Sequence, residues 1–164
     1  MGTIQREIRQ NRPFASAAEE AVVTLVATAD RVRDRLSQEV ASHGITLQQY
    51  NVLRILRGAG DEGLPTLEIA ARMVEKSPGI TRLLDRLEAH GLVRRVRCPR
   101  DRRQVLCHST DAANSLLADL GAPMARAAAH CLEPLDRAGT LELVSLLDRV
   151  RAATSPDALN SLNS

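Results

Sequence analysis

The pattern of hydrophobic and polar positions along the chain predicts a protein built mainly from helices. Apolar side chains recur every three or four positions in residues 15–42, 111–132 and 136–153, which is the periodicity of amphipathic helices. The residues of these stripes are Val22, Leu25, Val26, Ala29, Val32, Leu36, Val40, Leu116, Leu117, Leu120, Leu141, Val144, Leu147 and Val150. One small domain cannot cover a helix as long as residues 15–42, so we expect part of it to pack against a second chain.

Two shorter helices are predicted after the first long one. Thr46 and Gln49 have the spacing of a capping box, so a helix should begin after Thr46 and end at the glycine-rich residues 58–60. The next helix is short and begins at Pro65. Its expected inner face consists of Leu67, Ala70 and Ala71.

A further helix follows a tight turn at residues 74–76. Ser77 is expected to cap this helix, with Pro78 at its first position, and Gly91 should end it. Its buried residues should be Ile80, Leu83, Leu84 and Leu87. Two short helices joined by a turn of three or four residues form a helix-turn-helix.

The segment after this motif reads as a β-hairpin. Residues 92–97 and 104–108 alternate between apolar and polar side chains around a polar turn at residues 99–102. A helix-turn-helix followed by a basic hairpin is a winged helix. We therefore predict a mainly α fold of six helices with a β-wing of two or three strands, which dimerises through its N- and C-terminal helices.

The expected organisation has four parts along the chain. These are an N-terminal arm and first dimerisation helix (1–44), a winged helix-turn-helix domain (45–109), C-terminal dimerisation helices (110–153) and a flexible tail (154–164).

Composition and charge narrow the function. Hydrophobic residues make up 44% of the 164 residues but aromatic residues only 1%, so aliphatic side chains must pack the core, which suits helix packing. The net charge is only +2, yet residues 76–103 hold nine Lys or Arg and three Asp or Glu, a net +6. The rest of the chain is then −4. A basic block on a mildly acidic body is typical of a protein that docks on phosphates, although it can also be a solvated face.

Other classes find little support. The chain has no Gly-rich phosphate loop, no H-E-x-x-H and no G-x-S-x-G motif, so we expect neither an enzyme nor a cofactor. We find no signal peptide and no apolar run long enough to span a membrane. The three cysteines lack C-x-x-C spacing, and no set of ligands is spaced for a metal. We expect a cytoplasmic protein.

Three segments resemble the MarR family of bacterial regulators: residues 46–53, residues 81–93 and the wing string in residues 99–103. The resemblance covers about residues 22–150. It implies a homodimer that binds pseudo-palindromic operator DNA, by default as a repressor, and that responds to a small aromatic or anionic effector.

The resemblance places the second short helix in the major groove and the wing in the minor groove. The candidate DNA-binding residues are Ser77, Gly79, Thr81, Arg82, Arg86, Arg94, Arg95, Arg100, Asp101, Arg102 and Arg103. Asp101 would hold the hairpin tip while Arg103 enters the groove. Arg94, Arg95 and Arg97 would contact phosphates, or some of them would be plain solvated charge. Two alternatives stay open: Arg86 only pairs with Asp85 or Glu88, or Asp101 is only a turn residue.

The effector site and redox control are less sharply indicated. Tyr50 and Arg54 lie one turn apart, and with His43 they could line a pocket, or Tyr50 could pack against Ile45 with Arg54 as a surface charge. Cys98 in the wing is the one candidate redox thiol, because nearby cations could lower its pKa. A redox regulator of the same fold and an interaction module that does not bind DNA remain as alternatives.

Overall fold

A computed structural model describes residues 3–75, 79–98, 101 and 103–155 of the chain. The elements within these residues are α1 (Thr3–Glu7), α2 (Ala17–Ala41), α3 (Leu47–Ala59), the 3-10 turn η1 (Gly60–Glu62), β1 (Leu64–Pro65), α4 (Thr66–Arg72), α5 (Ile80–Ala89), β2 (Val93–Arg97), β3 (Val105–Ser109), α6 (Asp111–Cys131) and α7 (Arg137–Ala153). The chain forms two compact units, Met1–Ala127 and Ala128–Ser164. The predicted mainly α, winged helix-turn-helix fold is confirmed.

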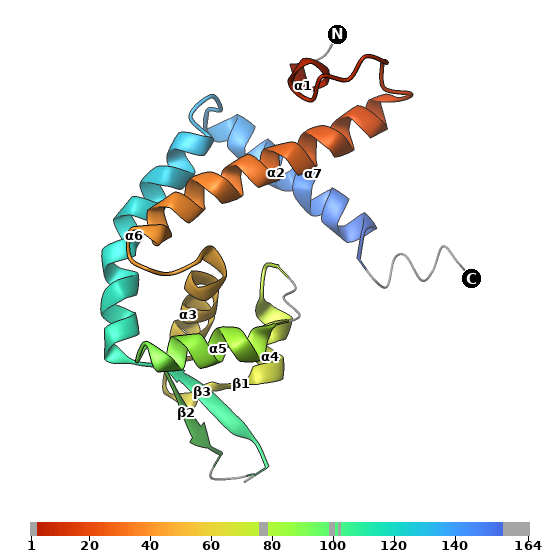
Figure 1. The fold of residues 1–164 in the computed structure, drawn as a ribbon. Helices are drawn as coiled ribbons and strands as arrows, with labels where there is room; N and C mark the ends of the chain where they lie inside the picture. The colour runs from red at the N-terminus through yellow and green to blue at the C-terminus, as the bar shows by residue number, and fades with distance from the viewer. Residues whose placement is uncertain (1–2, 76–78, 99–100, 102, 156–164) are drawn as a thin grey trace, which may run out of the picture. The chain divides into compact units, whose positions relative to one another are not determined.

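A small antiparallel sheet with strand order β1-β3-β2 forms the lower end of the first unit in Figure 1. β2 and β3 make the predicted hairpin, in which Val93 pairs with Ser109 and Arg97 with Val105. β1 adds a third strand of only two residues, Leu64 opposite Cys107 and Pro65 opposite Leu106. The strands β2 and β3 extend beyond α3, α4 and α5 at this end.

The core of this unit lies where α3, α4 and α5 pack together over β3. Its fully buried side chains include Leu53, Leu56, Ile69, Leu84, Leu87, Val40, Val52, Leu117, Leu120 and Cys107. The expected inner face of α4 was wrong at two of its three positions: Leu67 is 84% exposed and Ala71 is also exposed, whereas Ala70 is half-buried and Ile69 is fully buried. The short helix therefore packs mainly through Ile69.

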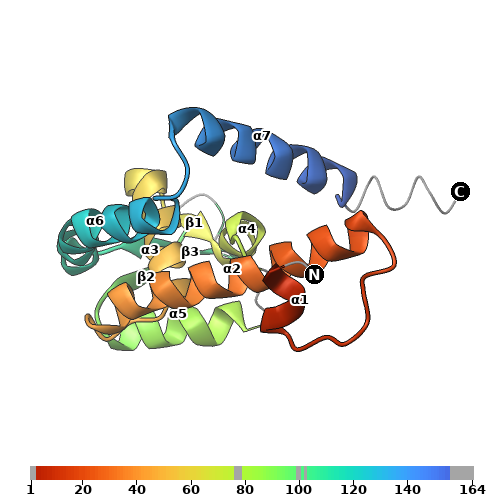
Figure 2. The ribbon, with the colours of Figure 1, turned by 90° about the horizontal axis from the view of Figure 1, so that it is seen from above.

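Local signals explain where α2 and α3 begin. The Ser16 side chain accepts a hydrogen bond from Glu19 N at the start of α2. Thr46 and Gln49 form the predicted capping box, with both reciprocal hydrogen bonds present. The sequence pattern did not indicate α1, which packs beside α2 through the buried Ile4 (Figure 2).

The second unit contains α7 and the last residues of α6. Asp136 caps α7 by accepting a hydrogen bond from Gly139 N. Apolar side chains stand exposed along α7, namely Leu141, Val144, Leu146 and Val150. Within the described residues, no helix is both long and apolar enough to cross a membrane.

Candidate nucleic-acid interface

The outer face of α5 carries two exposed arginines. Leu84 and Leu87 are fully buried on the inner face, which leaves Arg82 and Arg86 one turn apart on the solvent side. Thr81 is exposed beside them. The helix begins at Ile80, directly after Gly79. The predicted cap Ser77 and the predicted first helical residue Pro78 lie outside the described residues.

The carboxylates of α5 do not neutralise these arginines. Within the described part of the chain, neither Arg82 nor Arg86 forms an ion pair, so the alternative in which Arg86 only pairs with a neighbouring carboxylate is wrong. Asp85 and Glu88 are both bound by Arg95 of β2 instead. The two arginines of α5 therefore remain available to an anionic partner.

Arg95 differs from the expectation that it is a free phosphate contact. Its Nη1 donates to Asp85 Oδ1 at 2.6 Å and to Glu88 Oε2 at 2.9 Å, and its Nη2 donates to the carbonyl oxygen of Thr81 at 3.4 Å. Only 23% of its side chain is exposed. Burial lowers the pKa of the Arg95 guanidinium, but the bonds to Asp85 and Cys107 and the charges of Glu88 and Asp85 outweigh burial and raise it. This side chain ties β2 to α5.

The tip of the hairpin is organised by Asp101. Its carboxylate accepts a hydrogen bond from Arg103 N at 3.0 Å, and its carbonyl oxygen accepts one from Gln104 N at 2.9 Å. Arg103 is exposed, as are Arg94 and Arg97 on β2. Arg100 and Arg102, which we also expected to contact DNA, lie outside the described residues. Cys98 is a free thiol at intermediate exposure, and Cys107 is buried in the core.

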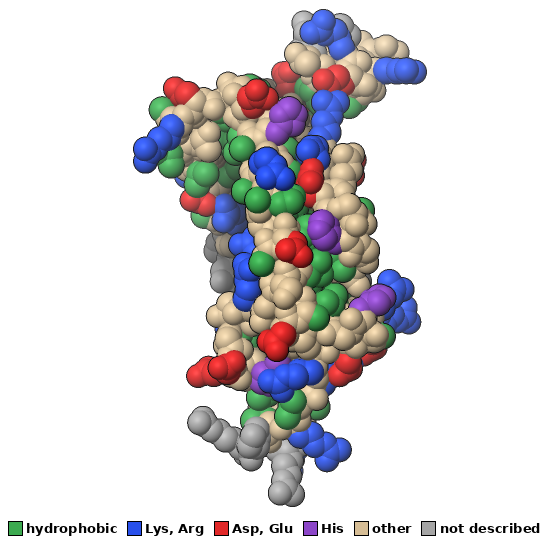
Figure 3. All heavy atoms as spheres, turned by 90° about the vertical axis from the view of Figure 1, so that its left-hand side faces the viewer, with side chains coloured by type: hydrophobic (Ala, Val, Ile, Leu, Met, Phe, Trp, Pro, Cys, Tyr) green, Lys and Arg blue, Asp and Glu red, His purple; other side chains and the backbone are tan. Residues whose placement is uncertain are grey.

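The basic side chains do not cover the whole surface. On the face drawn in Figure 3, Lys and Arg are interspersed with Asp and Glu, also at the hairpin end. By sequence, residues 76–103 carry a net charge of +6 and the remainder of the chain is mildly acidic.

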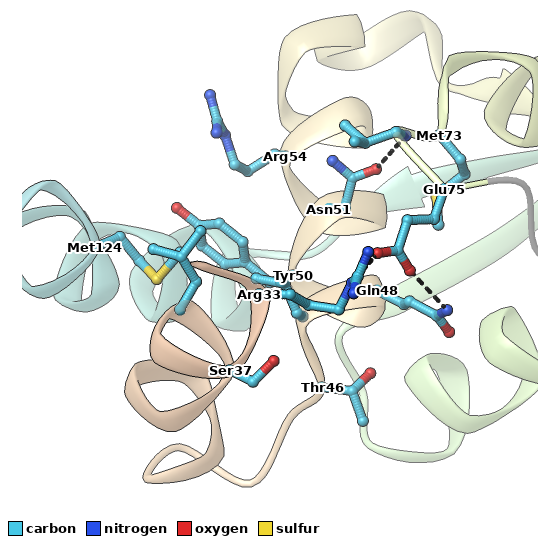
Figure 4. A pocket seen from close by; sticks show the side chains of 13 residues that line it. Arg33, Ser37, Thr46, Gln48, Tyr50, Asn51, Arg54, Met73, Glu75 and Met124 are labelled. Carbon is cyan, nitrogen blue, oxygen red and sulfur yellow. Dashed lines mark hydrogen bonds and ion pairs between the residues drawn. The ribbon is translucent and has the colours of Figure 1, made fainter. Parts of the chain in front are cut away.

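A pocket of about 390 Å³ lies in the first unit between α2, α3, α6 and the segment after α4 (Figure 4). Tyr50 and Arg54 both line it, and the Arg54 guanidinium lies 5.9 Å from the centre of the Tyr50 ring. Tyr50 is also buried in the core cluster that includes Ile45. The third candidate, His43, is exposed and does not line this pocket.

One wall of the pocket is an ion pair that the sequence did not reveal. Arg33 of α2 donates from Nε to Glu75, which also accepts a hydrogen bond from Gln48 at 3.4 Å (Figure 4). The bond to Arg33, followed by that to Gln48, holds the pKa of the Glu75 carboxyl below its ordinary value of 4.5. Because 42 residues separate the partners, neither local spacing nor periodicity indicates this contact.

A buried histidine is the other feature missed from the sequence. His108 on β3 is 8% exposed, and its Nδ1 has no hydrogen-bond partner among the described residues. Its ring lies against Gly63, where an added Cβ would come within 2.5 Å of the ring. Burial, and next the charge of Arg94, lower the pKa of His108, while Asp61 acts in the opposite direction. Among the described residues no group of three His, Cys, Asp or Glu is placed to hold a metal ion.

Comparison with known proteins places this fold in a family. The profile of the MarR family matches residues 45–105. A crystal structure of a MarR transcription factor from Planctomyces limnophilus is 39% identical, covers 83% of this chain and 98% of that chain, and has a TM-score of 0.65. The transcriptional regulator TtmR of Methylorubrum extorquens is 44% identical over 77 residues, which are 47% of this chain.

The sequence matches to the curated relatives span only part of those proteins. The match spans 38% of the length of TtmR, and 54% and 60% of two Bacillus subtilis regulators, YkoM and MhqR. Sco3205 of Streptomyces coelicolor, crystallised in complex with DNA, has the same fold with a TM-score of 0.76 at 21% identity over 91% of this chain and 96% of that chain. The winged helix-turn-helix and the likeness to almost all of the Planctomyces limnophilus chain lead to one conclusion: this chain belongs to the MarR family of transcriptional regulators.

Proposed function

We propose that this protein represses transcription by binding pseudo-palindromic operator DNA as a homodimer, and that a small aromatic or anionic effector releases it. The observation that carries the proposal is the pair of exposed arginines on α5 beside an arginine-tipped hairpin, in one compact unit. Arg82 and Arg86 can reach guanine edges or phosphates in a major groove, and Arg103 can enter the adjacent minor groove. Gly79 and Thr81 lie at the end of α5 that approaches the backbone, and Arg94 supplies a phosphate contact.

Apolar side chains that the single chain leaves exposed support the proposed dimer. On α2, Val22 and Val26 are 60% and 66% exposed, and α7 carries four exposed Leu or Val residues. Exposed apolar stripes of this kind mark association surfaces. A second copy of the chain is the natural occupant, because one recognition helix reads only a few base pairs and two-fold pairing doubles the site.

Binding to a duplex selected from a random pool tests the DNA proposal. The affinity, followed by fluorescence anisotropy, should fall steeply as salt rises, because the arginines displace counterions. Arg103→Ala should weaken specific binding by about 1–3 kcal/mol and leave the melting temperature unchanged. Arg57→Ala, which removes an exposed arginine at the C-terminal end of α3, is the matched control. Selection of no duplex by the wild-type protein would refute the proposal.

The pocket supports the effector part of the proposal. Its wall joins α2 to the segment that leads into α5, because Arg33 of α2 binds Glu75. A carboxylate ligand that takes Arg33 would displace Glu75 and loosen this connection. Benzoate should therefore bind and reduce DNA affinity, whereas neutral benzyl alcohol should bind more weakly. Arg33→Met should remove the preference for benzoate, as measured by calorimetry; an unchanged preference would exclude this site.

A further inference from the structure

Arg95 occupies a position between the two elements that the proposed function brings to DNA. It lies in the middle of β2, and its guanidinium reaches three groups on α5: the carbonyl oxygen of Thr81 and the carboxylates of Asp85 and Glu88. These groups are spread over two turns of the helix. One side chain therefore fixes both the distance and the direction of the hairpin relative to α5.

The strand register explains why this arginine faces the helix. Arg95 pairs with Cys107 across the ladder, and alternate residues of a strand share one face, so Arg95 lies on the side of the buried Val93 and Cys107. Arg94 is on the other side, opposite His108, and is exposed. Two neighbouring arginines of one strand thus have different surroundings.

The base of the hairpin is anchored near Gly91. Leu92 N donates to Leu87 O at 2.9 Å, and Thr110 Oγ1 donates to the carbonyl oxygen of Gly91 at 2.8 Å. Beyond this base, the Arg95 side chain links the hairpin to Asp85 and Glu88 of α5. Without it, the hairpin could pivot about its base while the core stayed packed.

From this arrangement we infer that Arg95 is a positioning residue for DNA binding: it braces the hairpin against α5 so that both reach adjacent grooves together. The inference rests on the proposed function. A brace and a phosphate contact predict different results, because each phosphate contact contributes about 0.9 to the slope of log affinity against log salt concentration, whereas a brace contributes nothing to it.

The first test compares Arg95→Ala with Arg94→Ala on the selected duplex. Arg94→Ala should lower the salt slope by about 0.9 per subunit. Arg95→Ala should weaken binding roughly tenfold or more and leave the slope unchanged. Arg95→Lys should lie between wild type and Arg95→Ala, because an ammonium keeps the charge but lacks the fork that binds two carboxylates and a carbonyl. A slope that falls equally in Arg94→Ala and Arg95→Ala would overturn the inference.

In the second test, a brace and a phosphate contact predict opposite changes in DNA affinity. The double variant Asp85→Asn, Glu88→Gln removes two negative charges from α5 and leaves Arg95 in place. If Arg95 were a phosphate contact, this variant would bind DNA more tightly, because repulsion falls and Arg95 is released. The brace predicts weaker binding despite the added positive charge. Asp61→Asn, Glu62→Gln on η1 makes the same charge change away from Arg95, and it should not weaken binding.

Thermal melting of each variant, followed by circular dichroism, checks that the first compact unit is folded. If Arg95→Ala does not fold, Arg95→Lys and the Asp85→Asn, Glu88→Gln variant still test the inference. Failure of the wild-type protein to select any duplex contradicts the proposed function itself. Tighter binding by the Asp85→Asn, Glu88→Gln variant contradicts the brace alone.

Discussion

The helices of the winged helix-turn-helix segment, residues 45–109 and called the winged unit below, and the long helices α2 and α7 use the same aliphatic residues with opposite results. On α5, Leu84 and Leu87 are fully buried, whereas on α2 and α7 Val26 and Val144 are 66% and 51% exposed. Periodicity shows that a helix has an apolar face, but it does not show what covers that face. The winged unit completes its core within one chain, and the outer helices carry stripes that one chain leaves open.

The largest expected loss of stability comes from truncating a buried side chain in the core of the winged unit. Leu84→Ala removes a fully buried side chain and should lower the free energy of unfolding by about 2–5 kcal/mol, because it leaves a cavity among Leu87 and its neighbours. Leu67→Ala makes the same chemical change on α4, where the side chain is 84% exposed, and should stay within about 0.5 kcal/mol of wild type. Urea unfolding measures both. Equal losses would mean that another chain covers Leu67.

Charged side chains introduced on the exposed apolar stripe of α2 should separate the subunits without unfolding them. In the double variant Val22→Asp, Val26→Asp, we expect association to weaken by at least about 100-fold, because an unpaired charge buried in an interface costs several kcal/mol. Sedimentation equilibrium measures the change, and circular dichroism should show an intact winged unit. Thr24→Asp, Thr28→Asp places the same charges on the opposite, exposed face of α2 and is the control. A dimer that persists in the Val variant would move the interface away from this stripe.

Much of the fold could be predicted because its signals are local. The capping box at Thr46, the positive-φ Gly91 that ends α5 and the alternation in residues 92–97 each act within a few residues. The expected core residues of α5 were right for the same reason, because its apolar residues all lie on one face of the helix. The inner face of α4 was not predictable in this way, because a helix of seven residues offers too few positions to define a stripe.

The sequence indicated the arginines of the candidate site but not the contacts that they make. Its arginines were found by counting charge, but their roles depend on partners far along the chain or on strand register. Arg95 could have been assigned to α5 from the period of two that it shares with the buried Val93, and this signal was present. The Arg33–Glu75 pair gave no local signal, because its two residues meet only after α2 and α3 pack.

A smaller effect on stability should come from His108, whose buried Nδ1 has no hydrogen-bond partner among the described residues. The pKa of His108 is lowered from 6.5, so the unfolded chain binds a proton at a higher pH than the folded unit does. Stability is therefore highest above pH 6.5 and should fall as the pH drops below it, until the folded His108 is also protonated. Urea unfolding between pH 7.5 and 5 measures this loss.

His108→Phe keeps a flat ring against Gly63 and removes the titrating group, so it should flatten that pH profile. Arg94→Ala should flatten it in part, because the positive charge of Arg94 is the second cause of the lowered pKa. His43→Gln, which changes an exposed histidine beyond the C-terminal end of α2, should leave the profile unaltered. If wild type and His108→Phe lose stability in parallel, the acid sensitivity comes from another group, and the unpartnered Nδ1 of His108 is tolerated without cost to the winged unit.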